Sequence, residues 1–307
     1  MTFKEYWPEY FELKRREVKP STLAAYFQQW KAHIALAFGD EDIEELSRSK
    51  SKMQAFIDSH SGQLSPKTVQ DIIIIIKNMI RLYYENVLGS AVMPTMRLRF
   101  PESEKHELEA YTKEEQKKLI AWVKENPSTM AFGIIIALTT GMRIGELCAL
   151  RWQDIDLDRG IIHVRGTLER VRDIDRLVGT KLIMSTPKSR SSRRDIPILP
   201  SVSKTMKIYA KISRPDYFVL SGTQKPVEPR HFRDSVSEMM AKAGVRRIKF
   251  HGLRHSFATS MIASGADLKT TSAILGHSSV EITMDVYVHP SQDDKRKSIG
   301  KTFKGIL

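Results

Sequence analysis

The stretch TGMRIGEL, residues 140–147, ends one helix and begins another within a few residues. A largely apolar helix is predicted over about 130–140, and Gly141 can adopt the left-handed conformation that commonly terminates a helix. Arg143 then lies at the start of the next helix, where unpaired backbone N–H groups favour an anion. Glu146, one turn later, can support a neighbouring polar group. Taken alone, this pair is more typical of a surface salt bridge between turns.

The first ninety residues are predicted to be helical. Aromatic and aliphatic residues recur at helical spacing near the N-terminus and over 23–34. Ser21 is expected to cap the second helix, and Ser65-Pro66 to begin another, because proline is tolerated in the first helical turn. Five consecutive isoleucines within 67–88 favour a strand locally, but the length and polar ends of this segment indicate a buried helix. We expect the aromatic stripes to form core rather than a base-stacking surface.

Composition divides the chain into four segments. Residues 1–90 are expected to form a helical domain, and the polar, proline-interrupted segment 91–110 a linker. A T-x-x-E capping box at Thr112 opens a second domain, 111–290. The remaining segment, 291–307, is a short basic tail that needs a groove to dock into. Its apolar residues share one helical face: Ile299, Phe303, Ile306 and Leu307.

The second domain mixes short strands with helices. Strands are predicted at 161–164, 182–185 and 195–199. The basic run 187–194 is interpreted as a hairpin tip, and the chain after Pro200 is predicted to be mainly helical to about Tyr287. The expected fold class is α+β: an all-helical N-terminal domain, then a mixed, mainly helical domain with a small antiparallel sheet.

Charge and cysteine content narrow the class of protein. The net charge is +13 and the isoelectric point about 9.7, which attracts polyanions such as nucleic acid, although ribosome-associated proteins share this property. The single cysteine, Cys148, excludes an intramolecular disulfide, and its apolar neighbours indicate a buried filler. No apolar run approaches the roughly 18 residues of a membrane span, and no signal core begins the chain. We therefore expect a cytoplasmic protein.

Five cationic or proton-carrying side chains precede one tyrosine in the second domain: Arg143, Lys188, His251, Arg254, His277 and Tyr287. The H-x-x-R spacing places His251 and Arg254 on one face of a helix. An arginine fork matches two phosphate oxygens, and a histidine beside it can transfer a proton near neutral pH. Each motif alone is weak, and no carboxylate or cysteine is spaced for a zinc site. Together, the six residues favour attack on a DNA phosphodiester.

The ordered series T-G-M-R-I-G-E-L, T-P-K-S, H-G-L-R-H-S, L-G-H-S-S and Y-V-H resembles the tyrosine recombinase (phage integrase) family. The resemblance covers about 110–290, and the first ninety residues are similar to that family's SAM-like core-binding domain. It implies a mobile-element integrase that rejoins DNA through a 3′-phosphotyrosyl link and a Holliday junction, with no cofactor or metal. An extra N-terminal arm-binding domain is not evident, which leaves arm-site recognition open and is also compatible with a truncated chain.

The resemblance implies a role for each site residue. Tyr287 attacks the scissile phosphate and releases a 5′-hydroxyl. Arg143 and Arg254 hold the non-bridging oxygens, and His277 adds a hydrogen bond. An unperturbed tyrosine has a pKa of about 10, so such a nucleophile needs a base or a strong positive field.

Three further residues complete the implied site. His251 assists proton transfer at the nucleophile, and Lys188 protonates the departing 5′ oxygen, which is otherwise a poor leaving group. Glu146 is the acidic supporter of the arginine cluster. The covalent link conserves the phosphodiester energy, and the sequence contains no G-x-x-x-x-G-K-[ST] loop for ATP.

Several biological roles stay open. The region 167–186 favours a mobile-element integrase, while promoter inversion and Xer-like dimer resolution are alternatives within the same chemistry. A type IB topoisomerase or a non-catalytic DNA-binding regulator are further alternatives. The implied partners are duplex DNA with a specific core site, a homo-tetramer assembled through the tail, and accessory DNA-bending or directionality proteins, in a bacterial or phage setting.

Overall fold

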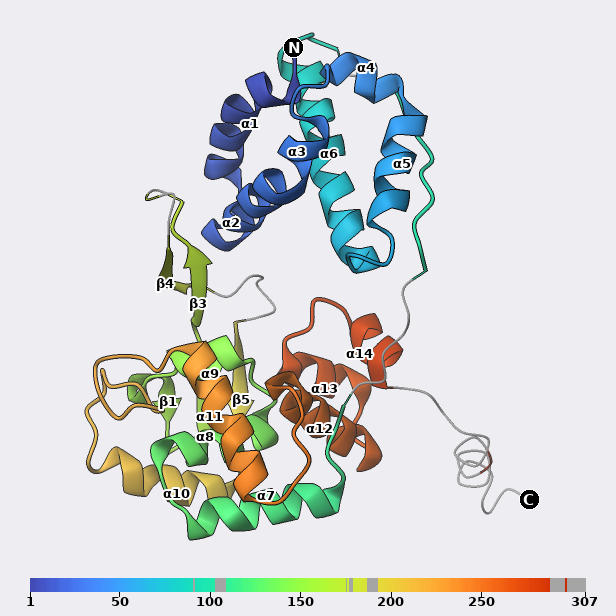
Figure 1. Ribbon diagram of the computed structural model, residues 1–307. Coiled ribbons are helices and arrows are strands. Elements are labelled where there is room, and N and C mark those ends of the chain that lie inside the picture. The colour runs from blue at the N-terminus through green and yellow to red at the C-terminus, as the bar shows by residue number, and fades with distance from the viewer. Residues whose placement is uncertain are drawn as a thin grey trace. The chain divides into compact units, whose positions relative to one another are not determined.

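The computed structural model describes residues 1–90, 92–102, 109–174, 176, 179–186, 193–287 and 296 (Figure 1). Its contacts divide the chain into two compact units. The N-terminal unit consists of Met1–His106 together with Val171–Lys181, and the second unit of Glu107–Arg170 with Leu182–Leu307.

Helix α6 supplies much of the core of the N-terminal unit. The helices of this unit are α1 (Phe3–Glu17), α2 (Pro20–Gln29), the π-helical turn η1 (Trp30–Ile34), α3 (Ala35–Phe38), α4 (Ile43–Arg48), α5 (Lys50–His60) and α6 (Pro66–Asn86). Within the isoleucine run, positions 72, 73, 75 and 76 are at most 3% exposed, whereas Ile74 is 54% exposed. One exposed position among five fits a helix and excludes an alternating strand, so the predicted buried helix is confirmed.

Two helix starts of this unit were predicted with different success. Ser65 caps α6 as expected, because its side chain accepts a hydrogen bond from the Thr68 N–H. The predicted Ser21 cap is wrong. Helix α2 already begins at Pro20, whose fixed φ suits the first helical turn, and its N-cap Lys19 makes no side-chain cap bond.

Residues 92–102 contain no helix or strand, yet they are held against the N-terminal unit. The side-chain amide of Gln54 donates to the carbonyl of Arg99 at 3.0 Å and accepts from its N–H at 2.9 Å. Four partly buried side chains of this segment pack on the core of the unit: Met93, Met96, Leu98 and Phe100. The first half of the segment expected to be a linker is therefore ordered by packing.

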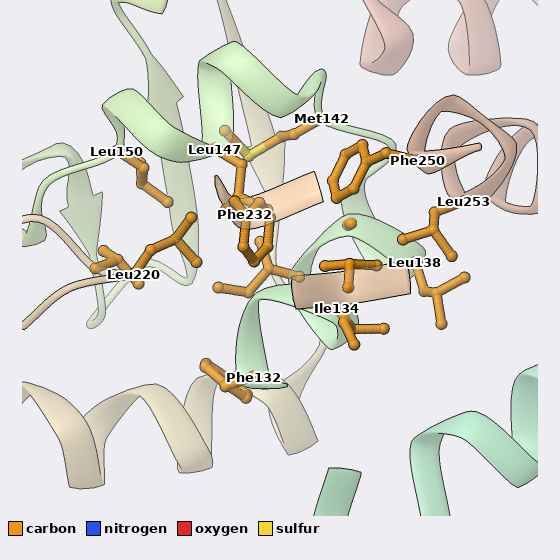
Figure 2. Packing of buried hydrophobic residues seen from close by; sticks show 14 of the residues in the cluster. Phe132, Ile134, Leu138, Met142, Leu147, Leu150, Leu220, Phe232, Phe250 and Leu253 are labelled. Carbon is orange, nitrogen blue, oxygen red and sulfur yellow. The ribbon is translucent and has the colours of Figure 1, made fainter. Parts of the chain in front are cut away.

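Helix α8 is central to the second unit and is mostly buried, and Figure 2 shows its Phe132, Ile134 and Leu138 among the packed hydrophobic residues. It spans Thr129–Thr140, and the other helices of this unit are α7 (Lys113–Glu125), α9 (Ile144–Ala149), the 3₁₀ turn η2 (Trp152–Asp154), α10 (Pro200–Ala210), α11 (Pro229–Lys242), α12 (Phe250–Ala263), α13 (Leu268–Leu275) and α14 (Val280–Tyr287). A Cβ at Gly133 would lie 2.5 Å from Leu220 and 2.8 Å from the Phe232 ring, so glycine is needed for this close approach. The predicted capping box at Thr112 is present at the start of α7.

Two small sheets complete the second half of the fold. Strands β1 (Ile155–Asp156), β2 (Ile161–Val164) and β5 (Arg194–Pro197) form an antiparallel sheet in the order β1-β2-β5, and β3 (Thr167–Arg172) pairs with β4 (Thr180–Ser185). The strands on either side of the predicted hairpin tip at 187–194, β4 and β5, belong to different sheets, so they do not form the predicted hairpin; residues 187–192 themselves lie outside the described residues. The turn between paired strands is instead closed by a bond from the Asp173 N–H to the Gly179 carbonyl at 3.1 Å.

Some predictions fall outside the described residues. Lys188 and the apolar stripe of the tail, Ile299 to Leu307, are among them. In the part of the chain that the structure describes, no helix has the length and apolar character needed to cross a membrane.

Candidate active site

Arg143 is held in place by the sharp turn between α8 and α9. Gly141 ends α8 with a φ of 63°, and a Cβ there would lie 2.6 Å from Phe257 and 2.8 Å from Leu275, so both conformation and packing require glycine. The Arg143 N–H donates to Oε2 of Glu146 at 2.9 Å, and its Nη1 donates to Oε1 at 2.9 Å. Glu146 therefore fixes both the backbone and the guanidinium of Arg143, whose side chain remains 38% exposed.

Arg254, on α12, is the largest buried cation of the site, with only 2% of its surface exposed. Its Nη1 donates to the carbonyl of Gly141 at 2.7 Å and its Nη2 to the carbonyl of Leu275 at 2.7 Å. Both carbonyls lie at helix C-termini, where they lack partners within the helix and where the dipole favours a cation. Arg254 therefore links the C-terminal ends of α8 and α13.

Three arginines donate hydrogen bonds to the C-terminal end of α13. Three consecutive carbonyls, 274–276, accept hydrogen bonds from Arg194, Arg254 and Arg143 in that order. Helix α13 then stops at Gly276 in the left-handed conformation, and His277 follows directly. The arginine cluster and the predicted histidine are thereby built around one helix terminus.

Glu146 is only 4% exposed and contacts a second arginine that the sequence analysis missed. Arg194 donates from Nη1 to Oε1 of Glu146 at 3.0 Å and from Nη2 to Oε2 at 2.9 Å. Burial raises the pKa of Glu146, but the bonds and charges of Arg194 and Arg143 outweigh it and hold this pKa below its ordinary value. Strand alternation could have indicated Arg194, because it shares an inward face with the buried Ile196.

The histidines of the site are neutral near pH 7. The Nδ1 atom of His277 lies 2.8 Å from the hydroxyl of the buried Thr283. Burial, followed by nearby positive charge, lowers the pKa of His277 to about 4. Burial is also the largest cause that lowers the pKa of His255 to about 4 and that of His251 below its ordinary value. These imidazoles can therefore serve as hydrogen-bonding groups rather than as cations.

Four of the six predicted residues have described side chains: Arg143, His251, Arg254 and His277. Tyr287 is the last residue of α14, which packs against α12 and α13. The described cluster holds three guanidiniums and one carboxylate, an excess of positive charge suited to a phosphate. Within the described residues, no three His, Cys, Asp or Glu side chains come together as metal ligands would.

Residues 109–294 match the phage integrase family, and residues 2–60 match the N-terminal SAM-like domain of phage integrases. The chain belongs to the phage integrase family. One relative of this chain, the tyrosine recombinase XerC-like protein of Caldanaerobacter subterraneus, is 29% identical over 210 residues, which are 63% of this chain and 53% of the relative. The tyrosine recombinase XerC of Xanthomonas campestris is 28% identical over 283 residues, which are 89% of this chain and 80% of the relative.

Solved structures share the fold of this chain. The Tn1549 transposon integrase in complex with transposon right end DNA matches with a TM-score of 0.80 and 19% identity, over 98% of this chain and 99% of that one. A lambda integrase tetramer bound to a Holliday junction matches with a TM-score of 0.64 and 19% identity, over 94% and 78% of the two chains. The predicted α+β fold with a helical SAM-like domain is confirmed, as is the prediction of a tyrosine site-specific recombinase.

Proposed function

We propose that this recombinase integrates and excises a phage or conjugative element through a 3′-phosphotyrosyl intermediate and a Holliday junction. The observation that carries the proposed chemistry is the convergence of Arg143, Arg254 and His277 at the end of α13. Preorganised donors of this kind stabilise the negative charge that develops on the equatorial oxygens of a transferring phosphoryl group. The buried Glu146 prevents Arg143 from folding away before DNA binds.

In the proposed reaction, Arg143 and Arg254 hold the non-bridging oxygens of the scissile phosphate. Neutral His277 donates a hydrogen bond to the same group, and His251 assists removal of the nucleophile's proton. Tyr287 attacks phosphorus, the bond to the 5′ oxygen breaks, and the 3′ end becomes linked to the tyrosine. Because each guanidinium is already anchored, little side-chain entropy is lost when the phosphate binds.

Lys188 is the proposed general acid. It would transfer its proton to the departing 5′ oxygen, and the same oxygen would return the proton when it attacks the phosphotyrosine during rejoining. Glu146 acts through Arg143 and does not itself contact the phosphate in this scheme.

Two observations bear on the biological role. The similarity to the Tn1549 transposon integrase over nearly the whole chain, and the β3–β4 hairpin inserted before β5, favour an integrase of a mobile element. The XerC relatives support the alternative of chromosome dimer resolution. A plasmid assay separates them: an integrase joins two different sites, whereas a resolvase acts on two copies of one site.

The proposed partners are duplex DNA with a core site, three further copies of the chain, and accessory DNA-bending or directionality proteins, in a bacterial cytoplasm. The lambda integrase tetramer on a Holliday junction supports the tetramer.

Deletion of 298–307 should impair tetramer assembly more than single-duplex binding. Equal loss of both would rule out docking of the tail on a neighbouring subunit.

The proposal is tested with nicked duplexes made from DNA that flanks the gene, incubated with protein in EDTA without ATP and run on a denaturing gel. The wild type should form a covalent adduct, and Tyr287→Phe should bind the same DNA without forming one. A non-catalytic regulator would give no adduct with either protein. Relaxation of any supercoiled plasmid without an adduct at the cognate site would favour the topoisomerase.

The role of Lys188 has a separate test. Lys188→Ala should slow cleavage, and a substrate with a sulfur in place of the 5′ bridging oxygen should recover most of the rate, because a thiolate needs no proton to leave. Without recovery, Lys188 would lose its assignment as the general acid.

A further inference from the structure

Arg194 lies at a junction of three elements although it is absent from the six-residue series. Its side chain is only 6% exposed, and it extends from β5 to Glu146 on α9 and to the Ile274 carbonyl at the end of α13. The position of β5 is itself fixed, because Val164 pairs with Arg194 in the antiparallel register of β2 and β5. The guanidinium is therefore presented from a rigid strand.

The charges around Glu146 explain why Arg143 alone would not leave a net positive charge for a phosphate. A carboxylate paired only with Arg143 would form a neutral ion pair, and it would compete with a phosphate for the same guanidinium. Arg194 adds a second cation on the carboxylate, bound through both of its oxygens. The group of Glu146, Arg143 and Arg194 then keeps one net positive charge next to the exposed face of Arg143.

We infer that Arg194 is a positioning residue of the recombinase: it neutralises Glu146, so that this carboxylate can hold Arg143 in place without cancelling its charge toward the scissile phosphate. The inference rests on the proposed chemistry at Arg143 and adds a residue to it. It also gives Glu146 a defined task, since a carboxylate beside a phosphate site would otherwise oppose anion binding.

The test is a double-mutant cycle on the full-length protein, with single-turnover adduct formation on a nicked duplex as the readout. Arg194→Gln should lower the rate by about 10- to 100-fold, while the DNA dissociation constant changes by less than about threefold. Arg194→Lys, which keeps the charge and loses the fork, should recover part of the rate. The matched control is Arg159→Gln, which removes the same charge from an 81% exposed side chain.

The decisive comparison uses the Glu146→Gln background. If Arg194 compensates the charge of Glu146, Arg194→Gln should lower the rate by less than about threefold once the carboxylate is gone. A loss of about tenfold or more in that background, or a normal rate in the single variant, would overturn the inference. The double variant buries no unpaired charge, so it decides the matter even where Arg194→Gln alone fails to fold. Absence of an adduct with the wild type would instead overturn the proposed function.

Discussion

The two units of the chain bury different kinds of side chain. The core of the N-terminal unit is aliphatic and aromatic, and its described buried polar or charged residues are Lys14, Ser47 and Asp173. The second unit buries a larger polar set: Thr140, Glu146, Arg254, His255, Ser256, Thr271, Ser272 and Thr283. Two of these, Glu146 and Arg254, hold the arginine cluster.

This difference separates stability from chemistry. A fully buried aliphatic or aromatic side chain stabilises a fold by roughly 1.5–3 kcal/mol, whereas desolvation largely offsets the attraction within a buried ion pair. We therefore expect substitutions in the N-terminal core to change stability and DNA affinity. Substitutions in the arginine cluster should change the cleavage rate first.

Arg254→Met should give the largest effect. Loss of the guanidinium removes a phosphate ligand and leaves the Gly141 and Leu275 carbonyls without this donor, so cleavage should slow by about 100- to 1000-fold or more. Stability should fall by about 1–3 kcal/mol. Single-turnover kinetics and urea unfolding measure the two effects. As a control, Lys242→Met removes a cation whose side chain is 60% exposed, and it should leave both nearly unchanged.

Ile76→Ala should affect the opposite property. Ile76 is fully buried, so its truncation should lower the free energy of unfolding by about 2–5 kcal/mol. The cleavage rate at saturating protein should stay within about threefold of the wild type. Ile74→Ala, at the exposed position of the same helix, is the matched control and should be neutral. A large loss of cleavage rate with Ile76→Ala at full DNA occupancy would contradict the expectation that the N-terminal core affects stability and not the chemical step.

Buried histidines should make the second unit sensitive to acid. The pKa of His255 is lowered to about 4 in the folded chain. At a pH between about 4 and the ordinary histidine pKa, the unfolded chain therefore binds a proton at His255 that the folded chain does not. The contribution of neutral His255 to the free energy of unfolding is fully present above the ordinary histidine pKa of about 6.5. It is lost as the pH falls toward 4, by as much as about 3 kcal/mol. Comparison of the wild type with His255→Asn in urea at several pH values isolates it. Parallel curves for the two proteins would contradict the buried, neutral imidazole.

Cys148 should give the smallest effect. Its side chain is fully buried, and burial raises the pKa of the thiol to about 12. A thiol reagent should therefore leave the folded protein unmodified and label it in concentrated denaturant. Cys148→Ala should lower stability by only about 1 kcal/mol and leave cleavage unchanged. Rapid labelling of the folded protein would show that α9 opens.

Local signals in the sequence were enough for most of the fold. The glycine at 141, the capping box at Thr112 and the Ser65 cap of α6 all follow from rules that act within one turn of helix. One of the two errors is local, and the other arose where distant segments decide. Ser21 failed because Pro20 starts α2 earlier, and the hairpin at 187–194 failed because β5 pairs with β2, thirty residues back in the chain.

The sequence predicted most residues of the candidate site, but it did not predict the hydrogen bonds that hold them in place. The series of motifs identified Arg143, Arg254 and the histidines but not Arg194, and the roles of these residues stay predictions. Sequence spacing gives no indication that the carbonyls of 274–276 would hold three arginines, because those bonds join β5, α9, α12 and α13. For the same reason Arg194 escaped notice, although its alternation with Ile196 was visible.

The most direct test of the account is to locate the covalent link itself. The wild type is trapped on a nicked duplex in EDTA, digested with protease, and the DNA-bound peptide is sequenced by mass spectrometry. The account predicts that the 3′ phosphate is attached to Tyr287 alone among the nine tyrosines of the chain. Attachment to another tyrosine, or cleavage that leaves no protein-bound end and requires a divalent metal, would contradict it.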